Sequence, residues 1–152
     1  MTTRPSPDRR QARVLVLQLL FQDDLNPRNN PAKGEEMLQT GLRQPDLVRF
    51  AKELLAGVRR NRRELDECLQ RVAENWTLDR MAAVDRNVLR LGAFELLHTD
   101  TPPGVVIDEA VELAKSFGTE HSGAFVNGIL DRLLRECKTA SAGRRGVPEV
   151  SP

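Results

Sequence analysis

Apolar residues recur at steps of three and four along most of the chain, which is the spacing of one face of an α-helix. A long series runs from Leu47 to Trp76, with a polar gap at 59–63, and further series begin at Asp85, after Pro103 and near Ser122. The series after Ser122 is the most regular: Phe125, Val126, Ile129, Leu130, Leu133 and Leu134. No segment alternates apolar and polar residues for long enough to predict a strand. The pattern therefore predicts an all-α fold.

Clusters of Pro and Gly divide this pattern into about seven helices. We expect helices over about 9–25, 34–42 and 85–98, one after 103, one from 122, and one long or two stacked helices between 46 and 76. The first is apolar nearly all round at 14–21, which indicates that it is buried or covers a partner. Residues 1–8 and 138–152 are typical of a flexible lead-in and a flexible tail, which leaves 9–137 as the folded part.

Composition narrows the class of protein. Aromatic residues make up 4% of the chain and tyrosine is absent, which favours helices over a β-sandwich or barrel. The net charge is +1, so any nucleic-acid surface must come from local clusters. The apolar stretch at 14–21 is far shorter than the roughly 20 residues that span a bilayer, so we expect a cytoplasmic protein with no membrane partner.

No complete catalytic, cofactor or metal motif is found in the sequence. Residues 118–123 have the glycine spacing of a phosphate loop, but Ala124 and Phe125 stand where Lys and Ser or Thr are required. Two Cys and two His are scattered singly, which predicts no metal site. The carboxylates Glu95, Asp108, Glu109 and Glu112 lie on predicted helices, where Asp108 and Glu112 fit solvated faces and no pair indicates acid–base catalysis. We therefore predict no catalytic residues, no cofactor and no enzyme.

Basic clusters are more informative. Arg9, Arg10 and Arg13 would be presented together by a helix that begins there, and guanidinium groups suit phosphate oxygens. Because cations at a helix start oppose the helix dipole, a phosphate contact and a solvated, frayed end both remain open. Acidic residues follow the cluster at 59–63 at i+4 spacing, which predicts an exposed helix face whose arginines form ion pairs with carboxylates one turn later.

Each aromatic residue matters in a chain with so few of them, because unpaired bases stack on rings. Four aromatic residues fall on apolar faces and are expected in the core: Phe50, Trp76, Phe94 and Phe117. Phe21 and Phe125 fit either the core or a surface platform.

Seven blocks of sequence carry a family resemblance. They are RRQAR at 9–13, QLLF at 18–21, LLAGV at 54–58, NWTLDR at 75–80, VDRNVLRLGAFEL at 84–96, VIDEAVELAKSFG at 106–118 and FVNGILD at 125–131. In this order and spacing, over about residues 9–135, the chain resembles the NusB family of transcription antitermination factors. Phe21 stands where that family often has Tyr, so it lacks a hydroxyl group.

The resemblance implies an all-helical fold of two small bundles packed across each other, with subdomains of about 9–75 and 76–137. It implies binding of boxA, a single-stranded RNA element of ribosomal RNA operon leaders, together with the small-subunit ribosomal protein NusE. It also implies assembly on RNA polymerase with other Nus factors, which promotes transcription of ribosomal RNA genes. The RNA-binding positions that it implies are Arg9, Arg10, Arg13, Phe21, Asp85, Arg86 and Phe125.

A function of a different class also fits the pattern of the first helix. The chain would then be a helical interaction scaffold without RNA binding of its own, and its nearly all-apolar first helix would form a homodimer.

Overall fold

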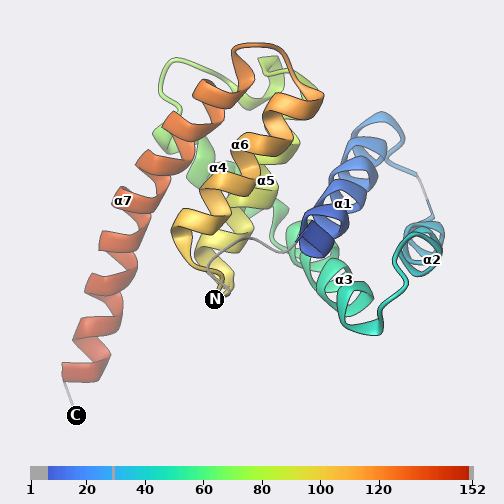
Figure 1. Cartoon of the computed structure of the whole chain (residues 1–152). Helices are drawn as coiled ribbons and strands as arrows, with labels where there is room; N and C mark the ends of the chain where they lie inside the picture. Colours follow the sequence, from blue (N-terminus) through green and yellow to red (C-terminus); the bar gives the residue numbers. More distant parts are fainter. Residues whose placement is uncertain (1–6, 29, 151–152) are drawn as a thin grey trace.

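The computed structural model describes residues 7–28 and 30–150, and within them it contains seven α-helices and no strand (Figure 1). This confirms the all-α prediction. The helices are α1 (Pro7–Leu25), α2 (Pro31–Gly41), α3 (Pro45–Arg60), α4 (Arg62–Val72), α5 (Ala83–His98), α6 (Pro103–Phe117) and α7 (Ser122–Val150), with a short 3₁₀ helix, η1 (Leu78–Arg80).

Proline is the first residue of four described helices, α1, α2, α3 and α6. Pro31, Pro45 and Pro103 lie in the first turns of α2, α3 and α6, where a fixed φ suits the helix and no N–H partner is required. The polar gap at 59–63 contains a real break, because α3 ends at Arg60 and α4 begins at Arg62. The series from 46 therefore forms two helices.

The helices pack as two groups. Helices α1, α2 and α3 contact one another, and α4, α6 and α7 surround α5. Helix α5 also contacts α1 and α3, so it joins the two groups, and its residues 87–95 are all buried. Helix α4 packs on α5 and α7, although the subdomain boundary expected near residue 75 would place it with the N-terminal group.

Helix α7 extends into the segment that the sequence predicts to be a C-terminal tail. The backbone of α7 continues to Val150, through most of the segment for which the sequence predicts a tail. Residues 1–6 and 151–152 lie outside the described residues. None of the described helices is long and apolar enough to cross a membrane.

The aromatic residues do not all lie where the helical pattern predicts. Phe94 is buried and Phe50 is half-buried, but 54% of Trp76 and 44% of Phe117 are exposed. The expectation that these last two lie in the core is wrong. Trp76 follows the end of α4, so the helical period no longer determines which way its side chain points. Phe117 is the last residue of α6, where no further helical turn covers its side chain.

Candidate nucleic-acid interface

Arg13 is part of the core and does not lie at a solvated helix end. Its Nε and Nη2 atoms donate to Glu95 Oε2 and Oε1, each at 2.8 Å. Both side chains are 2% exposed, and Arg13 Nη1 also lies 3.8 Å from Glu109 Oε1. Of the two alternatives that the sequence leaves open, the solvated, frayed end is therefore wrong for this residue. Its cation neutralises carboxylates from α5 and α6.

Arg10 lies at the border between the core and solvent. Its Nε and Nη2 donate to the two Glu109 oxygens at 3.1 and 2.8 Å. Glu109 is 1% exposed, whereas 49% of the Arg10 side chain is exposed. The hydrogen bond and the negative charge of Glu109 raise the pKa of Arg10. This guanidinium is thus held in place by a buried carboxylate while half of its surface remains open to an anion.

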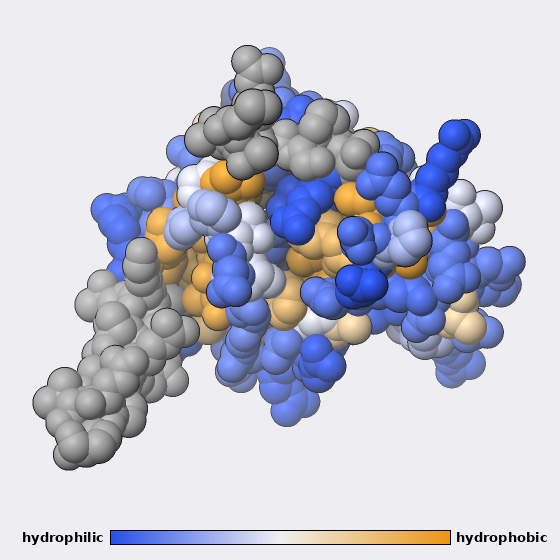
Figure 2. Space-filling view, turned by 60° about the horizontal axis from the view of Figure 1, so that its bottom comes forward, coloured by the Kyte–Doolittle hydropathy of each residue, from blue (hydrophilic) through white to orange (hydrophobic). Residues whose placement is uncertain are grey.

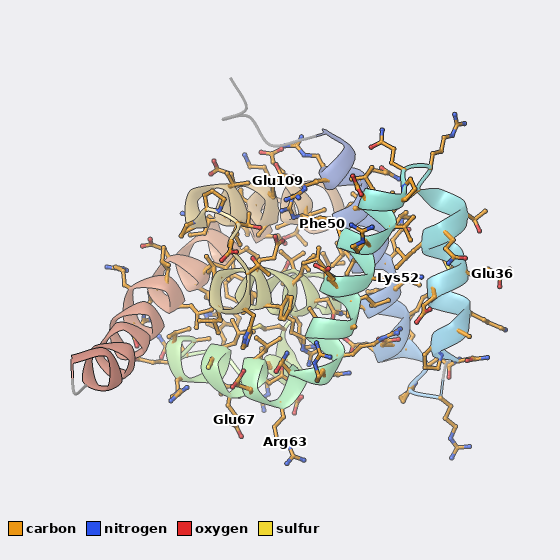
Figure 3. All side chains as sticks on the ribbon, turned by 90° about the horizontal axis from the view of Figure 1, so that it is seen from below. Glu36, Phe50, Lys52, Arg63, Glu67 and Glu109 are labelled. Carbon is orange, nitrogen blue, oxygen red and sulfur yellow. The ribbon has the colours of Figure 1, made fainter. Side chains whose placement is uncertain are left out.

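Arg9 points to another side of the α1 start. Its Cζ atom lies 4.4 Å from the centroid of the Phe50 ring, and Arg13 Cζ lies 5.1 Å from the same centroid. Figure 3 shows Phe50 from below, where α3 passes the start of α1. The aromatic ring thus places the Arg9 cation on α3 by cation–π contact.

Two hollows flank the beginning of α1. The larger, of about 970 Å³, lies between α3 and the turn after α5, and its cationic lining comes from Arg9, Arg49, Lys52 and Arg60. The second, of about 540 Å³, is lined by Arg10, Lys115, Asn127 and three carboxylates, Asp108, Glu109 and Glu112. Figure 2 turns the lower side of Figure 1 forward and shows apolar residues lying between hydrophilic ones on this face.

Phe21 lines a hollow to which none of the candidate arginines contributes. It is half-buried on α1 and lines a hollow of about 330 Å³ with Leu17, Val84 and Phe117. Asp85 follows Val84 in the first turn of α5, where a negative charge suits the helix dipole. Its Oδ1 atom is buried and accepts no hydrogen bond within the described part of the chain.

Arg86 is occupied by contacts within the molecule. It donates to Asp24 Oδ2 at 3.1 and 3.3 Å and to the carbonyl oxygens of Leu78 and Met81 at 3.0 and 3.1 Å. Its side chain is 16% exposed. Arg86 thus connects the start of α5 to the end of α1.

Asp24 is the centre of that connection. Its side chain is 8% exposed and also accepts from Asn87 at 2.8 Å, Arg62 at 2.9 Å and Arg90 at 3.3 Å. Burial alone raises the pKa of Asp24, but the hydrogen bonds from Asn87 and Arg86 and the charges of Arg90 and Arg86 outweigh it. The net effect is a lowered pKa, so the carboxylate is held in its charged form.

The arginines of the basic cluster at 59–63 do not form the expected ion pairs with carboxylates one helical turn later. Arg59 donates to Asp23 at 2.8 and 2.9 Å, Arg62 pairs with Asp24, and Asp66 pairs with Arg90 at 2.8 Å. The end of α1 lies against the α3–α4 junction, so its carboxylates replace the i+4 partners. Arg63 and Glu67 project outward from α4 (Figure 3).

Phe125 forms a separate aromatic contact. Its half-buried ring lies 5.3 Å from that of Trp76, at an interplanar angle of 75°. The structure therefore distributes the expected RNA-binding residues among four places: the start of α1, the Phe21 hollow with the neighbouring Asp85, the Asp24 ion-pair cluster, and the Trp76–Phe125 contact.

Sequence reasoning missed the buried positions of Glu95 and Glu109, which it grouped with other helix carboxylates without a function. A signal was present. Glu95 lies seven residues after Val88, and Glu109 lies three after Val106 and four before Leu113, so each falls in phase with buried apolar residues. A carboxylate on such a face predicts a buried cation partner.

Comparison with known proteins adds an independent observation. The family model of the NusB family matches residues 10–135. The chain belongs to the NusB family. The transcription antitermination protein NusB of Anaeromyxobacter dehalogenans is 44% identical over 146 residues, which cover 95% of this chain and 100% of that protein.

Solved NusB structures have the same fold. T. maritima NusB aligns with a TM-score of 0.76 and 40% identity, covering 88% of this chain and 94% of its own. A structure described as antitermination factors NusB and NusE in complex with dsRNA aligns with a TM-score of 0.77 and 30% identity, covering 87% and 99%. The NusB-like all-helical fold that the resemblance implies is thus confirmed.

Proposed function

We propose that this chain is a transcription antitermination factor that binds the single-stranded boxA RNA of ribosomal RNA operon leaders together with NusE. The observation that carries the proposal is the NusB family match over residues 10–135. It is supported by the fold shared with a NusB that was solved with NusE and RNA. A factor that promotes transcription of ribosomal RNA genes in bacteria acts in the cytoplasm, and it acts by binding RNA and protein partners, without catalysing a reaction.

The structure suggests which side chains meet the RNA. Arg9 and Arg10 are exposed, and both are held in place from behind, by the Phe50 ring and by Glu109. A pre-positioned guanidinium loses less conformational freedom when it binds a phosphate. Arg13 supports this surface indirectly, because its donor groups are engaged inside the protein. Arg86 lies near the other end of α1, where its donor groups are engaged by Asp24 and two carbonyl oxygens.

Charge explains why a partner protein is needed. The net charge is +1, and the hollow beside Arg10 contains three carboxylates. The chain alone therefore makes few phosphate contacts, and phosphate contacts dominate affinity for nucleic acid. A ribosomal protein that brings additional basic surface would raise the affinity. We place other Nus factors and RNA polymerase around this pair, as the family resemblance implies.

The homodimer scaffold is the alternative. In this structure the apolar residues of α1 are largely covered by the chain's own helices, since Val16, Leu17, Leu19 and Leu20 are at most 4% exposed. The nearly all-apolar character of α1 thus has an explanation within one molecule, which favours the RNA-binding function.

Titration of a fluorescently labelled boxA-type single strand, with and without NusE, tests the proposal. We expect saturable binding that becomes tighter when NusE is present. The scaffold alternative predicts no RNA binding under either condition, and self-association of the chain in sedimentation experiments.

A further inference from the structure

Trp76 is a large aromatic residue that the fold leaves open. It lies between α4 and η1, and 54% of it is exposed. Burying an aromatic side chain of this size would contribute substantially to stability. Its neighbours in sequence, Glu74, Asn75 and Thr77, are exposed and polar. The exposed indole is therefore flanked along the chain by polar residues.

The segment that carries Trp76 is held in a defined conformation. The side chain of Gln70 binds it on both sides: Nε2 donates to the Trp76 carbonyl oxygen at 2.6 Å, and Oε1 accepts from the Leu78 N–H at 3.0 Å. The Trp76 N–H also donates to the carbonyl oxygen of Ala73 at 3.0 Å. Five residues of turn are thus fixed by one amide side chain, and the indole is presented in a set position.

A second connection joins this turn to α7. Arg132 Nη2 donates to Glu74 Oε1 at 3.2 Å, and α7 also carries Phe125, whose ring meets that of Trp76 nearly edge to face. The two rings are therefore nearly perpendicular, and the exposed indole of Trp76 lies beside the half-buried ring of Phe125.

We propose that Trp76 and Phe125 together form a stacking site for one unpaired RNA base, with Trp76 as the exposed platform. This rests on the proposed RNA-binding function and adds to it a residue outside the expected RNA-binding set. A base presents a flat π-face of about the size of an indole and needs no wide apolar surroundings. A protein partner would require a contiguous apolar patch, whereas the residues that flank Trp76 in the sequence are polar and exposed.

The chain contains a single tryptophan, so its intrinsic fluorescence reports on this site alone. We expect boxA-type RNA added to the protein at low salt to quench the emission, because a stacked base does so. The quenching should saturate at the same RNA concentration as the anisotropy of labelled RNA. Unchanged emission while the anisotropy saturates would overturn the proposal.

Two substitutions sharpen the test in the complex with NusE. Trp76→Leu keeps apolar bulk but removes the π-face, and we expect a loss of RNA affinity of roughly 5- to 150-fold. Trp76→Phe keeps a ring and should retain most of the affinity. Unfolding curves verify that both variants fold, as expected for a residue that is half exposed.

The outcomes separate this inference from the proposed function. Unchanged RNA affinity of Trp76→Leu, with wild-type binding intact, overturns the stacking site alone. Weakened binding of NusE with unchanged RNA affinity would assign Trp76 to a protein contact and also overturn it. Absence of RNA binding by the wild type with NusE would overturn both proposals.

Discussion

Replacing Arg13 with alanine removes a cation that lies between two buried carboxylates. Glu95 and Glu109 are 2% and 1% exposed, and Arg13 meets them at 2.8 and 3.8 Å. Glu109 keeps its bond to Arg10, but Glu95 has no second cation among the ion pairs that the structure describes. The substitution therefore leaves an uncompensated charge in the core.

The size of the effect follows from that burial. Breaking a buried ion pair by removing one partner costs about 3–5 kcal/mol. For a protein of this length, each kcal/mol lowers the melting temperature by roughly 2–4 °C, so we expect a decrease of about 6–20 °C. A domain stabilised by only about 5–15 kcal/mol would lose a large fraction of its stability.

Urea denaturation followed by circular dichroism measures this loss. Arg9→Ala is the matched control: it removes an arginine four residues away that is exposed and whose cation–π contact contributes about 0.5–1 kcal/mol. The double variant Arg13→Leu with Glu95→Leu should be more stable than Arg13→Ala, because no unpaired charge remains at that site. A loss below about 1 kcal/mol for Arg13→Ala would refute the reasoning.

Three further predictions follow from the same contacts. Asp24→Asn should lower the free energy of unfolding at pH 7 by about 1.5–3 kcal/mol. Because the folded-state pKa of Asp24 is lowered, the stability that its charge contributes is present above the unfolded-state pKa of about 3.9 and is lost as the pH falls through the folded-state pKa. The unfolding curves of the wild type and the variant should therefore converge in acid. Gly57→Ala should lower the free energy of unfolding by about 1–3 kcal/mol in denaturation experiments, because the added Cβ would overlap the Phe94 ring. Gly128→Ala adds its Cβ to open space and should stabilise α7 slightly. Equal effects of the two substitutions would contradict the packing argument. Replacing Arg9 and Arg10 together with alanine should weaken RNA binding and flatten its log–log salt dependence by about 0.7 per lost phosphate contact; an unchanged slope would assign both residues to structure.

The helices were predictable because their apolar spacing is a local property of the sequence. The series after Ser122 and the proline residues that begin α3 and α6 indicate where helices begin without reference to any neighbour. The break at Asn61 was only partly predictable, since a polar gap fits a break or an exposed turn of one continuous helix.

The ion pairs were not predictable in the same way. Arg62 has an acidic residue four positions later, but its partner is Asp24, 38 residues earlier in the chain. Arg13 similarly finds Glu95 across 82 residues. Such partners depend on how helices cross, which local spacing does not determine. Trp76 was misplaced for a related reason: it lies in a turn whose conformation is fixed by the Gln70 side chain.

The most direct test of the account is the preference of the chain, paired with NusE, for one RNA sequence. Its affinity for a boxA-type single strand should be compared with that for a strand of the same length and composition in permuted order, at one fixed salt concentration. Phosphate contacts are the same for both strands, so a difference reports base recognition. We predict tighter binding of the boxA-type strand. Equal affinities would contradict the account.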